Sequence, residues 1–205
     1  MNLFNSRRAI LVCLVASALL PAPRALTVDD PTAASIRNFY DTLLAGMKRA
    51  TELGVSGRYD KLAPVIRQTF DFPAMTRIAV GPSWTSIPTE QQSALTDAFA
   101  RLTIATYASR FDGYSGARFD VEPASEVRGR NRIVRSRLIE PDGHVTPLSY
   151  LTHEAGAGWK VIDVYLNGTV SELATRRSEF GSVLNSGGAD ALLASLRERT
   201  EKLMK

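Results

Sequence analysis

The sequence has little of what thiol and metal chemistry require. Its 205 residues include one cysteine, Cys13, and two histidines, His144 and His153. A single thiol cannot form a disulfide within the chain, and neither histidine has a partner at the spacing of a metal site. We expect both histidines at the surface and a protein that holds neither metal nor cofactor.

Motifs that mark common enzyme classes are missing too. The sequence contains no glycine-rich phosphate loop, no H-E-x-x-H pair and no G-x-S-x-G elbow. It also has no internal repeats, low-complexity tracts or linkers that would divide it into domains. These absences predict one domain and argue against metalloproteases, nucleotide-dependent enzymes and serine hydrolases.

The first residues have the pattern of a secretory signal peptide. Arg7 and Arg8 precede an apolar run over 9–20, and small residues follow it. The run is shorter than the about 20 apolar residues that span a bilayer. Cys13 lies inside the run, whereas a lipid-attachment cysteine would lie at its end. We therefore predict a cleaved signal peptide over 1–25, export, and a mature protein without a lipid anchor.

Cleavage after Ala22 and cleavage after Ala25 both fit the pattern. Removal of residues 1–25 takes three of the 25 basic residues and none of the 21 acidic ones. The mature chain then has 22 basic against 21 acidic residues. Such a small excess of positive charge predicts no nucleic-acid partner.

The residues from 30 to 111 repeat their apolar side chains at helical spacing. Thr89 and Gln92 form a capping box at the start of the longest of these helices. Pro64 should start a turn or kink the second helix, and a loop holding Trp84 should separate the last two. The expected helices run over 30–54, 58–70, 71–81 and 89–111.

The helix that begins at Thr89 carries a wide aromatic stripe. Phe99, Tyr107, Phe111 and Tyr114 follow one another near its end, in a chain with only 8% aromatic residues. A long helix with such a stripe needs a large apolar partner. By itself the stripe is typical of an ordinary core.

Beyond residue 118 the pattern changes from helical spacing to alternation. A second capping box at Thr169 and Glu172 then opens a helix that should break at Gly187 and Gly188. Helices, an antiparallel meander and helices again predict one α+β domain over 26–205, with helices packed over a curved four-stranded antiparallel sheet. The expected strands run over 119–127, 133–139, 145–153 and 159–166.

Few charged residues suggest chemistry. Asp163 lies within a predicted strand and would be a general base if it pointed into a cupped sheet. Alternatively it faces solvent or pairs with an arginine of a neighbouring strand, and no second acid accompanies it. Arg176 and Arg177 would contact a lipid phosphate or a partner protein, or form a solvated helix face with nearby glutamates.

Three segments together resemble a known family. They read FDFPAMTRIAVGPSW at 70–84, TYASRFDGYSG at 106–116 and WKVIDVYLNGTVSELATRRSEF at 159–180. Their order and spacing resemble the MlaC family of periplasmic phospholipid-binding proteins, also called toluene-tolerance auxiliary components. The form of the last two segments is similar to the hopanoid-associated HpnM branch, so phospholipid and hopanoid both stay open as cargo.

The resemblance implies a fold and a function. The fold would be an NTF2-like cone whose helices and sheet enclose lipid tails. The protein would be a monomeric periplasmic carrier without enzymatic activity. Its partners would be an inner-membrane ABC transporter, or an RND-type exporter in the HpnM branch, and an outer-membrane complex. The residues expected to line the lipid cavity are Phe72, Met75, Ile78, Phe99, Leu102, Thr103, Tyr107, Phe111, Tyr114, Val134, Leu138, Leu148, Tyr150, Ile162, Val164 and Leu166.

Two further functions remain possible from the sequence. One is an enzyme of isomerase type on the same cone-shaped scaffold, with Asp163 as its base. The other is a periplasmic adaptor that binds no ligand, which an internal volume too small for one acyl chain would favour.

Overall fold

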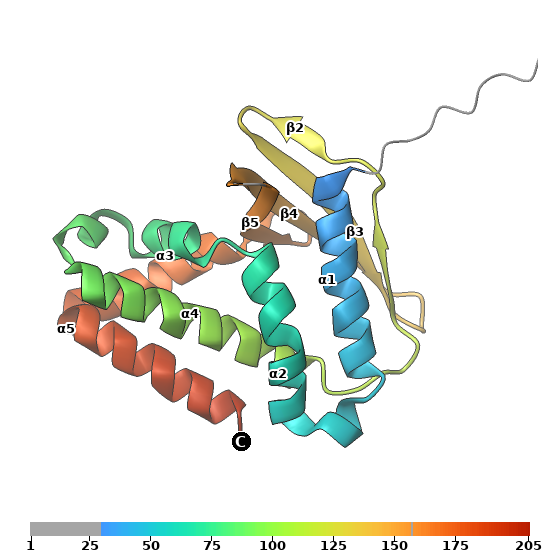
Figure 1. Ribbon diagram of the computed structural model, residues 1–205, viewed down its shortest axis with the longest axis horizontal. Helices are drawn as coiled ribbons and strands as arrows, with labels where there is room; N and C mark the ends of the chain where they lie inside the picture. The colour runs from blue at the N-terminus through green and yellow to red at the C-terminus, as the bar shows by residue number, and fades with distance from the viewer. Residues whose placement is uncertain (1–29, 157) are drawn as a thin grey trace, which may run out of the picture.

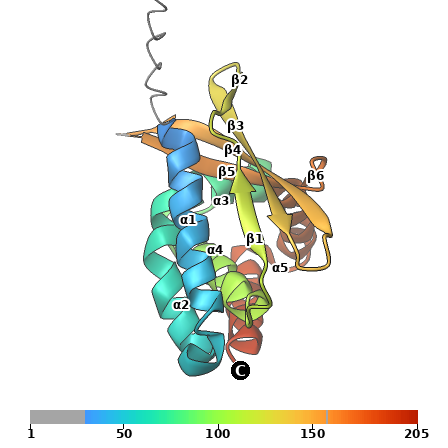
Figure 2. The same cartoon turned by 90° about the vertical axis from the view of Figure 1, so that its right-hand side faces the viewer.

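Five helices pack on one face of a twisted antiparallel sheet (Figures 1 and 2). The computed structural model describes residues 30–156 and 158–205, so the expected signal peptide over 1–25 lies outside the described residues. The helical elements are α1 (Pro31–Met47), α2 (Ala50–Thr69), α3 (Phe72–Val80), the 3-10 helix η1 (Gly81–Ser86), α4 (Thr89–Arg110) and α5 (Glu172–Leu203).

The sheet has six strands where the sequence predicted four. Neighbouring strands follow the order β1-β3-β4-β5-β6, and β2 also pairs with β3. The predicted strand over 119–127 is two short strands, because Pro123 interrupts it with a residue that has no N–H to donate. The strands are β1 (Arg118–Val121), β2 (Glu126–Arg128), β3 (Asn131–Ile139), β4 (Val145–Ala155), β5 (Gly158–Leu166) and β6 (Val170–Ser171).

The first two helices divide earlier than predicted. α1 ends at Met47, and α2 begins at Ala50. Gly54 lies inside α2 with φ 59° and ψ −176°, so the predicted break is a bend within this helix. α2 continues through Pro64. Its Arg58 is buried and donates to the carbonyl oxygens of Ala108 and Ala50, at 2.8 Å each, which ties α2 to the end of α4.

Both predicted capping boxes are wrong. The residue that caps α4 is Pro88, which has no side-chain acceptor, and Gln92 instead donates to the carbonyl oxygens of Trp84 and Ile87 at 2.9 and 3.0 Å. Gln92 therefore holds the end of η1 rather than the start of α4. At α5 the capping side chain is Ser171, whose Oγ accepts from the N–H of Ala174 at 2.9 Å.

The break predicted at Gly187 and Gly188 lies within α5. Gly188 has φ 70° and ψ −165°, and it separates two helical halves of this element. The first half contacts α3 and β5, and the second half runs beside α4 (Figure 1). This bend allows one element to cover both the sheet edge and the outer side of α4.

The centre of the core lies between α1, α4 and the sheet. Phe39 is fully buried, and its ring meets those of Phe70 and Tyr107 edge-on at centroid distances of 5.7 and 5.3 Å. Tyr40 stacks on Phe119 at 4.0 Å. These edge-on and stacked pairs are the favoured geometries of aromatic rings, so the aromatic side chains form a continuous network through the core.

Candidate functional site

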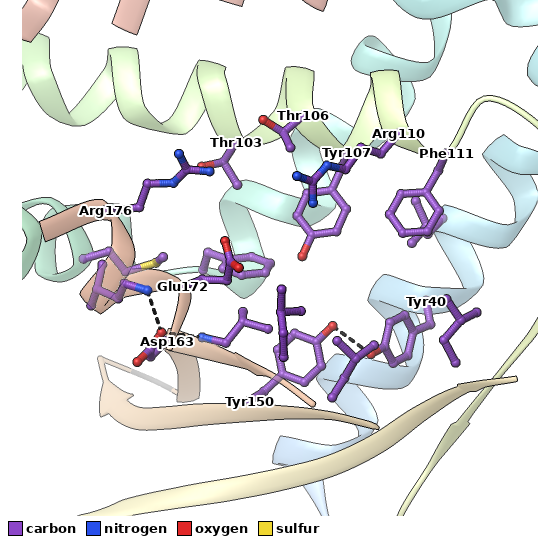
Figure 3. Close-up of a pocket in the computed structure, with 18 of the residues that line it drawn as sticks. Tyr40, Thr103, Thr106, Tyr107, Arg110, Phe111, Tyr150, Asp163, Glu172 and Arg176 are labelled. Atoms are coloured by element: carbon purple, nitrogen blue, oxygen red, sulfur yellow. Dashed lines mark hydrogen bonds between the residues drawn. The ribbon is translucent and has the colours of Figure 1, made fainter. Parts of the chain in front are cut away.

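A cavity of about 240 Å³ lies between α4 and the sheet, with α1 and the first turn of α5 on either side (Figure 3). Most of its lining is aliphatic or aromatic. Eleven of the residues predicted from the sequence line it: Met75, Phe99, Leu102, Thr103, Tyr107, Phe111, Leu138, Leu148, Tyr150, Val164 and Leu166.

Five predicted residues lie elsewhere. Phe72 is buried in the core between Phe70 and Phe99. Val134, on β3, is also buried and pairs with Tyr150 of β4. Ile78 is on the outer side of α3 and is 37% exposed. Tyr114 follows the end of α4, is 44% exposed, and lies under the ammonium group of Lys48. The fifth residue is Ile162.

A bulge in the sheet explains the position of Ile162. Tyr150 pairs with Val164 and Thr152 pairs with Val161, so β5 has one more residue than β4 between these pairs. Tyr150 and Thr152 are two residues apart and share a face, which places Val164 and Val161 on that face together. Ile162 is the extra residue, and the simple alternation assumed from the sequence fails there.

Other lining residues were not predicted. Tyr40 and Leu43 come from α1, and their spacing in the sequence does not differ from that of the core residues around them. The remaining apolar ones are Phe70, Phe119 and Leu173. The polar ones are Thr106, Arg110, Thr146, Asp163, Glu172 and Arg176.

The inner end of the cavity has a cluster of tyrosine hydroxyls. The Tyr40 hydroxyl is 2.7 Å from that of Tyr150 and 2.8 Å from Ser136 Oγ, and the Tyr107 hydroxyl points toward them (Figure 3). Burial raises the pKa of Tyr40 to about 12 and raises those of Tyr107 and Tyr150 further. All three therefore stay neutral at physiological pH, and the inner wall carries no charge.

Asp163 has no free oxygen for catalysis. It is 6% exposed, and one of its carboxylate oxygens accepts from the backbone N–H groups of Val164 and Leu173 at 2.8 and 3.0 Å. The other accepts from Ser171 Oγ at 2.6 Å. It neither faces solvent nor pairs with an arginine, so both of those predictions are wrong. Its carboxylate instead fixes the turn that leads from β5 into α5.

Besides Asp163, three charged side chains border the cavity: Arg110 on α4, and Glu172 and Arg176 on α5. Arg176 donates to Glu179 at 2.9 Å, as expected for a helix-face pair. It is nevertheless a lining residue and is not fully solvated. Arg177 packs its guanidinium over Gly81 at the end of α3 and is not among the lining residues.

The described residues contain no cluster of metal-binding side chains. Within 30–156 and 158–205, no group of three or more histidine, cysteine, aspartate or glutamate side chains is placed to hold a metal. Among the helices of this part of the chain, none is long and apolar enough to cross a membrane. His153 is engaged by Asp71 at 2.8 Å. The cavity suits an apolar ligand with a polar end, because its walls are mostly apolar and a few charged side chains border it.

The chain is similar in sequence and in fold to known proteins. Residues 37–198 match the profile of a family described as MlaC protein. The toluene tolerance protein ttg2D of Pseudomonas putida is 25% identical over 186 residues, which cover 90% of this chain and 85% of that protein. A phospholipid-binding protein from Ralstonia solanacearum, solved in complex with a phospholipid, superposes with a TM-score of 0.73 at 26% identity. That match covers 86% of this chain and 99% of the other.

Proposed function

Because this chain belongs to the MlaC family, we propose that it is a periplasmic carrier that encloses the acyl chains of a phospholipid in the cavity between α4 and the sheet. The observation that carries the proposal is this apolar cavity, in a fold shared along 99% of a protein whose structure holds a phospholipid. We also propose that the helices and the sheet together form an NTF2-like cone.

The physics of lipid transfer requires such a cavity. Each methylene group of an acyl chain costs about 0.8 kcal/mol when it is exposed to water. A carrier must therefore cover nearly the whole chain with apolar side chains. Phe99 and Leu102 on α4, opposite Leu148 and Val164 on the sheet, supply this surface. The uncharged tyrosines at the inner end allow a tail to approach without meeting an ion.

The cavity must widen to hold two acyl chains. Its volume of about 240 Å³ is below the roughly 300–1,000 Å³ of typical small-molecule sites. We expect α4 to move away from the sheet as tails enter, because side chains rather than backbone hydrogen bonds join these two walls.

The proposal extends to partners and cargo. A carrier cleaved after residue 25 would work in the periplasm as a monomer, taking lipid from an inner-membrane ABC transporter or an RND-type exporter and exchanging it with an outer-membrane complex. Hopanoid as cargo stays a prediction from the sequence. The isomerase alternative loses its support, since the only proposed base, Asp163, is fully engaged by hydrogen-bond donors.

Lipid loading of matched variants tests the proposal. The mature chain, stripped of lipid, is incubated with phospholipid vesicles or hopanoid-containing vesicles and is examined by native mass spectrometry. The wild type should bind one lipid. Val164→Asp places a charge on the cavity wall and should lower loading at least about tenfold, whereas Val145→Asp, at an exposed position outside the cavity, should not.

A second variant guards against misfolding of the first. Thr106→Trp fills the cavity from a half-buried position on α4 without adding charge, and it should also lower loading. A folded wild-type chain that takes up neither lipid would contradict the carrier proposal and favour an adaptor. Equal loading of wild type and both cavity variants would place the lipid elsewhere.

A further inference from the structure

Glu172 and Arg110 at the cavity have no side-chain partner among the residues that the structure describes. Arg176 is held by Glu179, which also accepts from Arg199 at 3.0 Å. In the part of the chain that the structure describes, no side chain forms a hydrogen bond or ion pair with the Glu172 carboxylate or the Arg110 guanidinium. Arg110 is exposed and Glu172 is half-buried, so a ligand that pairs with the Glu172 carboxylate would replace the solvent that this carboxylate has lost.

The hydroxyl groups beside these charges are acceptors. Thr103 donates its hydroxyl hydrogen to the carbonyl oxygen of Phe99 at 2.9 Å, and Thr106 donates to that of Leu102 at 2.8 Å. Their oxygens therefore offer lone pairs to the cavity. Together with the Glu172 carboxylate they offer acceptor oxygens to the cavity.

The arrangement of these side chains separates the two charges. Thr103, Thr106 and Arg110 follow one another along α4. The Glu172 carboxylate points from α5 into the space below them, and the Arg110 guanidinium lies over the ring of Tyr107 in this view (Figure 3). Both charges act on Tyr107, since burial and Glu172 raise the pKa of its hydroxyl while Arg110 lowers it. The rim thus carries a carboxylate and a guanidinium at different positions, in addition to the ion-paired Arg176 beside Thr103.

On the basis of the proposed lipid carriage, we propose that this rim selects phospholipids whose headgroup carries a primary ammonium, with the ammonium bound by Glu172 and the phosphate bound by Arg110. A primary ammonium has three donors for the carboxylate and the threonine oxygens. A choline headgroup has no N–H to donate. A glycerol headgroup has no positive charge for Glu172, although its phosphate would still suit Arg110.

Competition between headgroups tests this proposal. The lipid-free mature chain is offered vesicles of equal parts phosphatidylethanolamine, phosphatidylglycerol and phosphatidylcholine with the same acyl chains, and the bound lipid is identified by mass spectrometry. The wild type should be enriched in phosphatidylethanolamine by about tenfold, as expected for one charge-assisted hydrogen bond.

The variants assign the preference to residues. Glu172→Gln should abolish the enrichment in phosphatidylethanolamine, and Glu172→Lys should shift the preference toward phosphatidylglycerol. Arg110→Gln should lower the loading of all three lipids, because each has a phosphate. The matched controls are Glu198→Gln on α5 and Arg101→Gln on α4, which are exposed and ion-paired with Lys202 and Asp97 and should behave as wild type.

The possible outcomes distinguish the headgroup preference from the proposed lipid carriage. Equal loading of the three lipids by the wild type, or an enrichment that persists in Glu172→Gln, would overturn the headgroup preference and leave the carrier intact. Failure of the wild type to load any of them would instead contradict lipid carriage itself, and the headgroup proposal with it.

Discussion

At the scale of single residues, Asp30 shows how one carboxylate joins distant parts of the chain. It caps α1 by accepting from the N–H of Thr32 at 2.8 Å, and its second oxygen accepts from the N–H and the hydroxyl of Ser125 at 2.7 and 2.6 Å. Arg132 adds a longer contact at 3.4 Å. The start of α1 is thus attached to the segment that links β1 and β2.

These contacts make stability depend on pH. Burial acts to raise the pKa of Asp30, but the hydrogen bonds from Ser125 and Thr32 outweigh it and hold the pKa well below its usual range. A lowered folded-state pKa means that the stabilisation is complete above the unfolded pKa of about 3.9 and is lost as the pH falls below it.

We therefore predict that Asp30→Asn lowers the free energy of unfolding by about 1–3 kcal/mol at pH 7, and that its difference from the wild type shrinks below about pH 4. Urea titrations followed by circular dichroism at several pH values measure this. Asp112→Asn, at an exposed position after α4, serves as the control and should match the wild type. A deficit that is constant down to pH 3 would show that the charge of Asp30 is irrelevant.

At the scale of elements, the bend of α5 depends on one glycine. Gly188 has a positive φ that other residues adopt at a cost, although a Cβ added there would meet no atom within 4 Å. Gly181 lies in the same element without a positive φ and with equal space. The two glycines therefore differ in backbone conformation and not in packing.

Alanine at these two positions should have opposite effects. Gly188→Ala should lower the free energy of unfolding by about 1–3 kcal/mol through backbone strain. Gly181→Ala should leave it unchanged or raise it by about 0.4–1 kcal/mol. Urea unfolding measures both. Equal effects of the two substitutions would mean that the bend in α5 does not require the left-handed conformation.

Most elements could be predicted from the sequence, because apolar spacing and glycine positions are local. β3, β4 and β5 lie within two residues of their predicted bounds, and α3 ends at Gly81 as expected. Asp30 caps α1 as predicted, but the caps of α4 and α5 were predicted wrongly, since Gln92 binds the carbonyl oxygens of Trp84 and Ile87 and Ser171 replaces Thr169 as the capping residue. The bulge at Ile162 depends on the pairing of β4 with β5, which no local pattern specifies.

The cavity could be predicted only in part for a similar reason. The aromatic stripe of α4 and the alternation of the strands supply two of its walls. The contribution of Tyr40 and Leu43 depends on how α1 crosses the sheet, and their spacing looks like that of any core helix. Glu172 was expected on a solvated helix face. The hydrogen bonds of Asp163 to Ser171 and Leu173 fix the turn that brings the first turn of α5 to the cavity.

At the scale of the whole molecule, folding and lipid binding should be linked. A ligand that binds only the native state raises its stability by about 2.7 kcal/mol at a free concentration one hundred times the Kd. We predict that the lipid-loaded chain melts at a higher temperature than the stripped chain, and that Thr106→Trp loses most of this difference. Differential scanning calorimetry of both forms measures it, and identical melting of the wild-type forms would be inconsistent with a lipid buried in the fold.

The three tyrosines at the cavity have a spectroscopic consequence. Neither tryptophan lines the cavity: Trp84 lies in η1, and Trp159 lies beneath the guanidinium of Arg132 at 4.9 Å. Tryptophan emission thus originates from outside the site, while the near-ultraviolet absorbance of Tyr40, Tyr107 and Tyr150 originates from within it. Cargo exchange should therefore change the tyrosine absorbance through these three of the six tyrosines, with little change in tryptophan emission, and can be followed in the unlabelled protein.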